Sequence, residues 1–478
     1  MSSIIRCRSG LMALSVIGDA PVLIEICDAK GFPETIYRFQ GTPPGAIVRH
    51  KNKSCTGGLR MTSPIIRASS RRRFLQYLAA SPLFASGAVS AYGTEAPSKL
   101  PDPMIWAPAG GDLINDPKQA INVFDFEPVA RRNEPPAHFG YMASGLHDEV
   151  TLRANREGFL KFQLRPRRLN DVSKVDIGVE LFGTRYDSPI FVCPTGGNQF
   201  FHPDGEVAVA KAARAGNHLQ ILSTVSNYSV EDVTKARGAP VWFQLYASPR
   251  FEIAQALIKR AEAAGCPVLM VTVDRLAGRN QETLFRLTRT DTRECSACHD
   301  RTGFAARSVR RHNYDGIDLT GVTGGGESSN LSWETVKRMR DITRMKIMLK
   351  GIVTAEDAEL AVQNGIDGIL VSNHGGRGED NGRSTIDALP EIITAVKGQL
   401  PVMVDSGFRR GTDAVKALAM GAQAIGIGRP YLWGLGAFGQ EGVERVLEIV
   451  RTETRTAMQQ CGVRSVKELN PSFVRRAT

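Results

Sequence analysis

The sequence predicts an α/β fold, a parallel (β/α)8 TIM barrel with a helical segment in front of it and a long loop after its fourth strand. Eight short apolar runs recur between about residues 185 and 440, and Ala-rich segments with helical spacing separate most of them. Both faces of these strands are apolar, which is typical of parallel sheets. The span matches the roughly 250 residues of such a barrel. An open doubly wound sheet is the alternative, but no Gly-x-Gly-x-x-Gly follows the first strand.

The individual elements follow from these runs. The predicted strands are 190–193, 219–222, 241–245, 268–273, 346–349, 368–371, 402–404 and 424–427. Helices are expected over 207–215, 251–264, 355–364 and 412–420, and a helical pattern also runs from 121 to 169. Residues 275–340 are too many for a simple connection after the fourth strand, so we expect an active-site excursion there.

The chain divides into four regions. Residues 1–60 are a doubtful extension without usable periodicity, and residues 61–91 form the second region. Residues 92–114 are a Pro/Gly-rich linker, and residues 115–470 are the barrel domain. In the second region three arginines, Arg71 to Arg73, precede a stretch of apolar and small residues, which resembles a twin-arginine export signal. A basic amphipathic helix is the alternative. The signal predicts a periplasmic protein that starts at Met61, and without it we expect a cytoplasmic one.

Composition limits the function classes. Of the net charge of +11, +8 lies in residues 1–91, so the barrel domain is not a basic nucleic-acid binder. No apolar run reaches the roughly 18 residues of a membrane span. Eight cysteines in 478 residues are too sparse for a fold built on disulfides.

Polar residues or glycines follow every predicted strand. The carboxyl ends of barrel strands meet at one mouth, where active sites collect, so these residues indicate one shared polar ligand. They are Thr195, Gly196, Ser223, Gln244, Tyr246, Thr272, Asp274, Lys350, Ser372, His374, Arg377, Asp405, Gly407, Gly428 and Arg429. A phosphate would fit residues 405–413, which contain glycines, a helix start and Arg409. Arg429, after the last strand, would add a second positive charge.

A phosphate at that position leaves Ser223, Gln244, Thr272 and Lys350 to meet a flat heterocycle. A second group of residues remains for a small ligand: Tyr141, Tyr246, Arg279, His374 and Arg377. A titratable imidazole beside guanidinium groups and phenols suits proton abstraction from a small carboxylate that bears a hydroxyl.

These blocks resemble the FMN-dependent 2-hydroxy acid oxidase and dehydrogenase family. The matching stretches are 141–145, 243–246, 349–351, 372–377, 405–413 and 428–430. The resemblance implies an FMN enzyme that oxidises a lactate-like (S)-2-hydroxy acid to the 2-oxo acid and passes electrons to a cytochrome or quinone. An oxidase that uses oxygen and makes hydrogen peroxide is the alternative, and a flavin isomerase and a non-catalytic binding barrel are further ones. A homo-oligomer, a tetramer, is also implied.

The resemblance also implies residue roles. His374 would be the base, and Asp274 would stabilise its protonated form. Lys350 would lie by the flavin N1–O2 edge. The substrate would be held by Tyr141, Tyr246, Arg279, His374 and Arg377. The cofactor would be held by Thr195, Gly196, Ser223, Gln244, Thr272, Lys350, Ser372, Asp405, Gly407, Arg409, Gly428 and Arg429.

Three features depart from the family pattern. The segment 274–280 is shorter than its family equivalent, which places Arg279 only to within about a residue. Ser406 replaces a usual Gly. Gly196 replaces a common Ala, so we expect it to open the space at the flavin N5 side.

The excursion contains Cys295-Ser296-Ala297-Cys298-His299. The spacing fits covalent attachment of a c-type haem. A zinc site with His299 or His312 as a further ligand, a redox disulfide, and an inert pair remain open alternatives.

Overall fold

The computed structural model describes residues 2–7, 10–15, 113–293, 308–322 and 329–477. The chain divides into two units, residues 1–99 and residues 100–478. In the first unit the described part is an antiparallel hairpin of β1 (Ser2–Cys7) and β2 (Gly10–Ser15). The proposed export signal, 61–91, lies outside the described residues, as does 92–112 of the linker.

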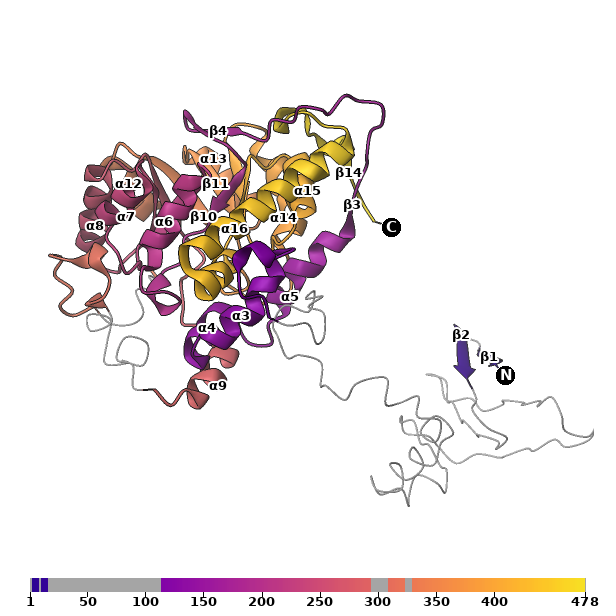
Figure 1. Ribbon diagram of the computed structural model, residues 1–478, viewed down its shortest axis with the longest axis horizontal. Helices are drawn as coiled ribbons and strands as arrows, with labels where there is room; N and C mark the ends of the chain where they lie inside the picture. The colour runs from indigo at the N-terminus through magenta and orange to yellow at the C-terminus, as the bar shows by residue number, and fades with distance from the viewer. Residues whose placement is uncertain (1, 8–9, 16–112, 294–307, 323–328, 478) are drawn as a thin grey trace, which may run out of the picture. The chain divides into compact units, whose positions relative to one another are not determined.

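The second unit is built on a closed barrel of eight parallel strands, in which the last strand pairs with the first (Figure 1). This confirms the predicted fold. The strands are β6 (Ile190–Val192), β7 (Leu219–Ser223), β8 (Trp242–Tyr246), β9 (Val268–Thr272), β10 (Lys346–Ile352), β11 (Gly368–Val371), β12 (Val402–Val404) and β13 (Ala424–Ile427). All eight coincide with the predicted apolar runs, and β10 extends three residues further.

Helices surround the barrel. They are α6 (Gly205–Ala215), α7 (Val230–Arg237), α8 (Phe251–Ala263), α12 (Trp333–Asp341), α13 (Ala355–Gln363), α14 (Thr385–Val396), α15 (Gly411–Ala419) and α16 (Arg429–Cys461). Side-chain oxygens of Ser229, Thr354 and Ser384 accept backbone N–H bonds at three of the helix starts. Helix α16 bends at Phe438 and Gly439, whose backbone angles are not helical.

The segment before the barrel forms α3 (Phe126–Asn133), α4 (Pro136–Ala143) and α5 (Val150–Glu157). The short 3-10 turns η1 (Pro117–Gln119), η2 (Val123–Asp125) and η3 (Gly158–Lys161) flank them. The predicted helical pattern is therefore confirmed in part. It is wrong at β3 (Phe162–Leu164), which pairs antiparallel with β14 (Val474–Arg476). That pairing joins opposite ends of the domain, so local spacing could not indicate it.

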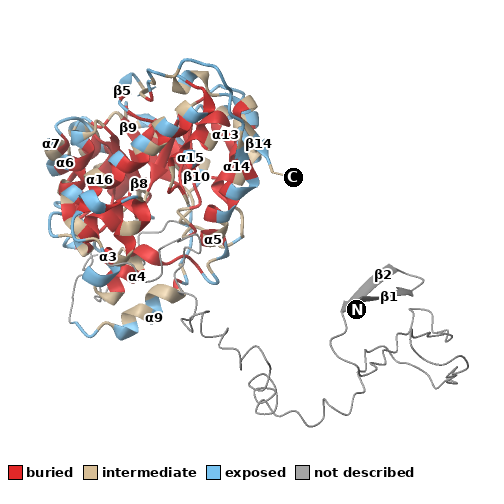
Figure 2. Ribbon diagram, turned by 45° about the vertical axis from the view of Figure 1, so that its right-hand side comes forward, coloured by how far each residue is buried: buried red, intermediate tan, exposed pale blue. Residues whose placement is uncertain are grey.

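A hairpin packs against the apolar interior of the barrel. Strands β4 (Val179–Leu181) and β5 (Thr184–Tyr186) contribute Leu181 and Tyr186 to the cluster inside the barrel. Phe182, between these strands, packs against Trp242 with ring centroids 5.5 Å apart. A second apolar layer separates strands from helices, and Figure 2 shows the buried interior in red. Polar residues are thereby left for the carboxyl ends of the strands.

The excursion after β9 is confirmed. It contains α9 (Glu282–Thr290) and the 3-10 turn η5 (His312–Tyr314) before α12 begins. Residues 294–307 lie outside the described residues, and with them Cys295, Cys298 and His299. Among the described residues, no helix combines the length and the apolar character that a membrane span requires.

Candidate active site

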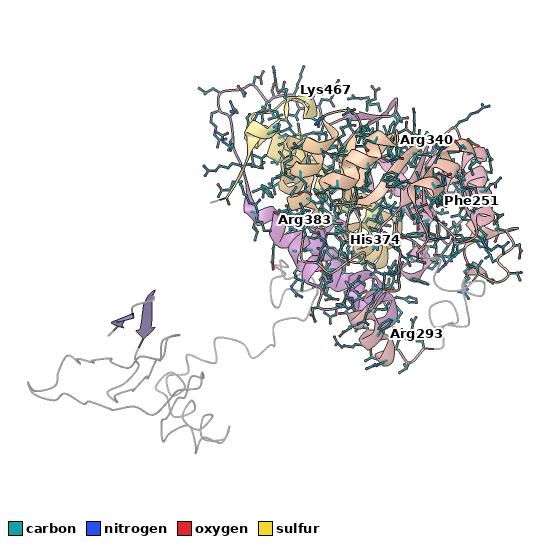
Figure 3. All side chains as sticks on the ribbon, turned by 180° about the vertical axis from the view of Figure 1, so that it is seen from behind. Phe251, Arg293, Arg340, His374, Arg383 and Lys467 are labelled. Carbon is teal, nitrogen blue, oxygen red and sulfur yellow. The ribbon has the colours of Figure 1, made fainter. Side chains whose placement is uncertain are left out.

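His374 lies in the loop after β11, at the carboxyl end of the barrel, and Figure 3 labels it. Its φ of 60° is in the left-handed region, which is strained for any residue but Gly. The ring Nδ1 lies 2.8 Å from Asp274 Oδ1, and Nε2 lies 3.1 Å from the Tyr246 hydroxyl. Because a carboxylate only accepts, we assign the proton to Nδ1. The lone pair of Nε2 then faces the barrel mouth beside Tyr246, as a base requires.

Burial keeps the His374 ring neutral, and the neighbouring His374 and Lys350 keep Asp274 ionised. Burial lowers the pKa of His374 to about 3, although Asp274 opposes the shift. Burial alone raises the pKa of Asp274, but His374 and Lys350 outweigh it and hold the pKa at about 2. The Lys350 ammonium lies 3.8 Å from Asp274 Oδ2 and 3.3 Å from His374 Nδ1. A neutral base beside a fixed carboxylate can take a proton, and its imidazolium form then gains an ion pair.

Arg377 follows His374 by three residues and is held against the end of α4. Its Nη1 donates to the carbonyls of Tyr141 at 2.6 Å and Ser144 at 2.9 Å, and the guanidinium lies over the Tyr141 ring, 4.9 Å from the centroid. Gln281 completes this network. We assign its amide so that the oxygen faces the donors, and it then accepts from Arg377 Nη2 at 2.8 Å and from the Ser144 hydroxyl at 3.0 Å.

A further arginine, to which the sequence assigned no role, lies near the base. Arg275, directly after Asp274, lies over the Tyr246 ring, 4.7 Å from its centroid. Arg279 is half-buried in the same segment. Burial lowers the pKa of Arg377 to about 9, and Arg279 and Arg275 add repulsion that acts in the same direction. Arg279 and Arg275 thus lie close enough to Arg377 to repel it, and this concentration of positive charge favours an anionic ligand.

Sequence reasoning missed Ser144, Gln281, Arg275 and Glu379. Burial, followed by repulsion from Asp274, raises the pKa of Glu379 to about 7. No spacing or motif distinguishes Gln281 or Ser144, which meet only through the contact of α4 with the excursion. Arg275 carried a signal, since it adjoins the acid at the end of β9.

Four neighbouring strands, β7 to β10, present buried polar side chains, and those of β7 to β9 are joined by hydrogen bonds. Ser223 donates to the Gln244 amide oxygen at 3.0 Å, and Gln244 donates to the Thr272 hydroxyl at 2.7 Å. Lys350, 3% exposed, donates to the hydroxyl of Ser372, directly after β11, at 3.1 Å. A barrel interior is normally filled by apolar residues. A row of donors and acceptors with one buried cation fits the polar edge of a flavin ring.

The ends of β12 and β13 contain the residues predicted for a phosphate. Gly407 has a φ of 85°, and a Cβ at Gly428 would have only Cys193 within 4 Å, at 3.9 Å. Arg429 donates to the carbonyls of Met142, Ser144 and Gly375.

The other residues predicted at this end are buried in the same region. Asp405 accepts from the Ser406 hydroxyl at 2.7 Å, and Arg409 lies over Trp433, 4.9 Å from the ring centroid. The open space at Gly428 and the two arginines fit a phosphate.

The space expected at Gly196 is not open. A Cβ at this position would lie 2.6 Å from the Val225 carbonyl oxygen. The expectation that Gly196 widens the site is therefore wrong, because the loop after β7 fills the volume that a methyl group would occupy. Thr195 lies next to it, and the Thr195 carbonyl accepts from Asn198 Nδ2 at 2.6 Å.

A haem or zinc site in the excursion was one of several alternatives that the sequence left open. The described parts of the chain hold no group of three or more His, Cys, Asp or Glu residues placed to bind a metal. His312, an alternative zinc ligand, lies 2.9 Å from Asp315. The Cys295 and Cys298 hypothesis lies outside the described residues.

Three comparisons place this geometry among known proteins. The model of the FMN-dependent dehydrogenase family matches residues 130–476. An L-lactate oxidase of Lysinibacillus sphaericus (strain C3-41) is 41% identical over 367 residues, covering 75% of this chain and 95% of that protein. A peroxisomal (S)-2-hydroxy-acid oxidase of Oryza sativa subsp. japonica is 40% identical over 358 residues, covering 74% of this chain and 95% of that protein.

Solved structures agree. A soluble mutant of the membrane-associated (S)-mandelate dehydrogenase from Pseudomonas putida superposes with a TM-score of 0.69 at 32% identity, covering 75% of this chain and 100% of that one. A flavocytochrome b2 variant with pyruvate bound gives a TM-score of 0.67 at 31% identity, covering 75% and 87%. With the barrel, the His374–Asp274 pair and the flavin-compatible row of polar residues, these matches show that the chain belongs to the FMN-dependent dehydrogenase family of 2-hydroxy acid oxidoreductases.

Proposed function

We propose that this FMN-dependent 2-hydroxy acid oxidoreductase acts on a lactate-like (S)-2-hydroxy acid and forms the 2-oxo acid. The observation that carries the proposal is the base: His374 Nε2 lies beside Tyr246 while Asp274 holds Nδ1 at 2.8 Å. Similarity to an L-lactate oxidase supports a small side chain on the acid, and similarity to an (S)-2-hydroxy-acid oxidase supports the configuration.

The chain's own residues would bind and orient the acid. Arg377 and Arg279 would bind its carboxylate, since they repel each other and a bound anion relieves that repulsion. Tyr246 and Tyr141 would hydrogen-bond it. His374 would take one proton, and Asp274 would stabilise the imidazolium. The bound FMN supplies a two-electron acceptor.

The cofactor would be held along the mouth. Ser223, Gln244, Thr272 and Lys350 would meet the ring, with Thr195, Gly196 and Ser372 beside them. Asp405, Gly407, Arg409, Gly428 and Arg429 would hold the phosphate end. Absorbance spectra of the purified protein before and after L-lactate test both ligands, because flavin bands must be present and must bleach. A colourless protein that does not take up FMN contradicts the proposal. A Soret band would identify haem on the Cys295 motif.

We infer that electrons leave to a cytochrome or quinone. Superposition on a flavocytochrome b2 and on a mandelate dehydrogenase supports this acceptor class. An oxidase is the second candidate, favoured by the similarity to an L-lactate oxidase. Reduction by L-lactate without air, followed by timed exposure to oxygen, separates them. Slow reoxidation supports the dehydrogenase, whereas reoxidation at the rate of turnover with stoichiometric peroxide supports the oxidase.

We also propose export through the twin-arginine route and assembly into a tetramer. Three consecutive arginines before an apolar stretch support export. In a bacterial host, the full chain should appear in the periplasmic fraction, and Arg71→Lys with Arg72→Lys should retain it in the cytoplasm. Equal fractionation of both proteins contradicts export. Light scattering of the purified enzyme gives the oligomeric state.

A further inference from the structure

A buried pair of asparagines lies behind the loop that carries His374. Asn155, on α5, and Asn373, directly before His374, are each 1% exposed and lie 218 residues apart in the chain. Asn155 Nδ2 donates to Asn373 Oδ1 at 2.9 Å, and Asn373 Nδ2 donates back to Asn155 Oδ1 at 2.8 Å. The reaction described above assigns no role to this reciprocal amide pair.

Backbone groups around the pair fix how each amide faces. The N–H of Thr385 donates to Asn155 Oδ1 at 3.3 Å. The N–H of Gly376 donates to Asn373 Oδ1 at 3.1 Å, and Asn373 Nδ2 also donates to the Arg383 carbonyl at 3.1 Å. A turned amide would set donor against donor or acceptor against acceptor at these contacts. The pair therefore has one arrangement, which needs the oxygen and the nitrogen of both side chains.

Asn373 holds the turn of the catalytic loop, residues 373–378. His374, Gly375 and Gly376 have φ values of 60°, 67° and 77°, a left-handed run that histidine rarely adopts. The main-chain carbonyl of Asn373 accepts from the N–H groups of residues 376–378 at 3.1 to 3.3 Å, and its side chain accepts a further bond from Gly376. The position of the His374 ring thus depends on where Asn373 is held.

The amide pair is also joined to the end of β12. Thr385, whose N–H binds Asn155, donates its hydroxyl to the Asp405 carbonyl at 2.6 Å. Next to it, the Ser406 hydroxyl accepts from the Gly375 N–H at 3.0 Å. These bonds close a ring from α5 through the catalytic loop to β12 and back. A shift of the Asn155 side chain would therefore reach the loop from both sides.

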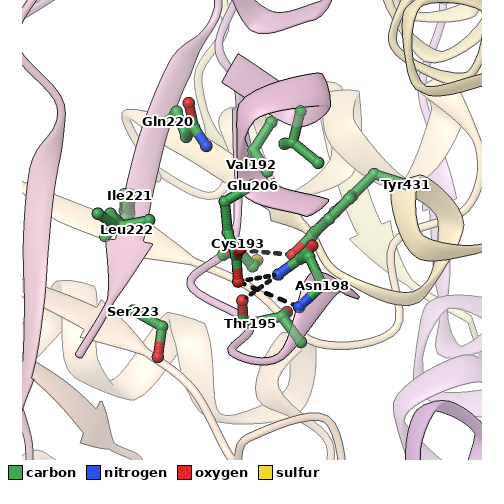
Figure 4. A pocket seen from close by; sticks show the side chains of 11 residues that line it. Val192, Cys193, Thr195, Asn198, Glu206, Gln220, Ile221, Leu222, Ser223 and Tyr431 are labelled. Carbon is green, nitrogen blue, oxygen red and sulfur yellow. Dashed lines mark hydrogen bonds between the residues drawn. The ribbon is translucent and has the colours of Figure 1, made fainter. Parts of the chain in front are cut away.

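Another buried polar cluster behind the mouth does not include this loop. In Figure 4, Glu206 of α6 lines a small cavity and accepts from the backbone N–H and the side-chain amide of Asn198, both at 3.1 Å. Glu206 joins the segments after β6 and β7, and β7 lies four strands from β11 in the closed barrel. The Asn155–Asn373 pair, by contrast, has one member inside the catalytic loop.

We propose that Asn155 is a positioning residue for the reaction: through its amide pair with Asn373 it holds His374 in the left-handed conformation from which Nε2 faces the barrel mouth. The helix that carries Asn155 precedes the barrel, so the segment in front of the barrel would take part in placing the base. This role rests on the proposed function, because it needs His374 as the base. The amide pair itself does not depend on it.

Asn155→Asp tests the role through a single hydrogen. Aspartic acid has the shape of asparagine, and its neutral form can donate to Asn373 Oδ1 as the amide does. Its ionised form sets a second acceptor against that oxygen. Asn155→Ala removes the contact at every pH. The two variants therefore differ in whether acid can restore the pair.

The charges near the pair favour the neutral acid. Arg156 is already paired with Asp413 at 2.8 Å, and Arg383 is paired with Glu391. Asp405, at the end of β12, adds negative charge. Burial beside these groups should raise the pKa of an aspartic acid at position 155 above its ordinary value of about 3.9. The hydrogen is then regained as pH falls.

At pH 8 we expect N155D and N155A to lower kcat per bound flavin by about 10- to 100-fold, because a displaced base loses its reactive geometry. At pH 5, N155D should recover to within about threefold of wild type at the same pH, while N155A stays slow. FMN Kd and KM should change less than kcat. Rates of anaerobic flavin bleaching by L-lactate at saturating FMN give the measurement. The control, Asn364→Asp, makes the same change at the exposed end of α13 and should match wild type throughout.

Several results would overturn the proposal. N155A with wild-type kcat removes the positioning role, and so does N155D that stays as slow as N155A from pH 8 to pH 5. Loss of bound FMN with an unchanged kcat per flavin assigns Asn155 to cofactor retention instead. N155D that equals wild type at every pH while N155A is slow supports the role, because the acid is then neutral throughout. If N155A is insoluble, the pH dependence of N155D still decides.

Failure of the proposed function gives a different result. A wild-type protein that L-lactate does not reduce contradicts that function and leaves the amide pair to be tested by stability. The thermal midpoint of N155D, relative to that of N364D, should rise as pH falls from 8 to 5, because the neutral acid restores the bond to Asn373. An unchanged difference would show that the pair does not hold the loop.

Discussion

The proposed reaction depends most on one residue, His374. We expect His374→Gln to lower kcat by about 10²- to 10⁴-fold, because general-base contributions have that size. FMN content should stay at the wild-type level, since the contacts proposed for the cofactor lie on other residues. Anaerobic flavin bleaching by L-lactate measures the step directly. His202→Gln, at a half-exposed histidine after β6, is the matched control. A loss below tenfold in H374Q would assign the base elsewhere.

The pKa shifts predict an unusually wide pH range of activity. Since burial lowers the pKa of His374 to about 3, the free enzyme keeps a neutral base throughout the neutral and mildly acidic range. Activity is lost only as pH falls through that pKa. At the alkaline side no limb is expected from Arg377, because a guanidinium stays protonated in proteins even where burial lowers its pKa. The profile of kcat/KM should therefore be flat between about pH 5 and 8. An acid limb near the ordinary histidine pKa, about 6.5, would contradict it.

Ser406 is strained at the place where the family usually has Gly. Its φ is 78°, and its hydroxyl accepts from the Gly375 N–H at 3.0 Å, next to His374. Ser406→Gly relieves about 1 kcal/mol of backbone strain but loses two hydrogen bonds, the one from Gly375 and the one to Asp405, so stability should fall by about 1 kcal/mol. We expect kcat to fall, because the His374 loop loses its support.

Urea unfolding and steady-state kinetics separate these effects of Ser406→Gly. Lys397→Gly is the control, since Lys397 has a φ of 50° at the end of α14, away from the site. It should gain stability and leave kcat unchanged. An S406G enzyme with wild-type kcat would show that the hydroxyl does not hold the loop.

The bend of helix α16 requires glycine at two positions. It bends at Phe438 and Gly439, so that Gly434 and Gly442 meet backbone to backbone, and a Cβ at Gly442 would collide with the Gly434 carbonyl. Gly442→Ala should therefore destabilise the protein by about 1–3 kcal/mol, despite the better helix propensity of Ala. Thermal unfolding with Gly278→Ala as control, where a Cβ meets nothing within 4 Å, measures the difference. Equal stability of the two variants would mean that α16 can straighten.

The whole molecule should lose stability in mild acid through His218. This buried ring bonds Ser188 at 2.9 Å, and burial lowers its pKa to about 4. The unfolded chain binds a proton near pH 6.5 while the folded one does not, so stability is present above 6.5 and falls as pH drops toward 4. The loss from this group is about 3 kcal/mol. The urea midpoints measured at pH 7 and pH 5 should differ less for His218→Gln than for the wild type. An equal difference in the two proteins would contradict the assignment.

The sequence by itself determined the barrel and the arrangement of its mouth. Short apolar runs at regular intervals specify β6 to β13 because strands buried on both faces must be apolar throughout. Parallel strands in a closed barrel send all their carboxyl ends to one side. His374, Asp274 and Tyr246 therefore share one mouth, and the resemblance to the family implied that Asp274 pairs with His374.

Only the tertiary structure decided the contacts between distant segments. Three such contacts join residues with no common spacing. Strand β3 pairs with β14, Gln281 contacts Ser144 and Arg377, and Val225 fills the space beside Gly196. Their partners are chosen by packing, because a loop's path depends on the volume and hydrogen bonds that neighbouring elements leave to it. Local periodicity indicates which face of an element is buried, but it does not indicate which residue of another element packs against that face.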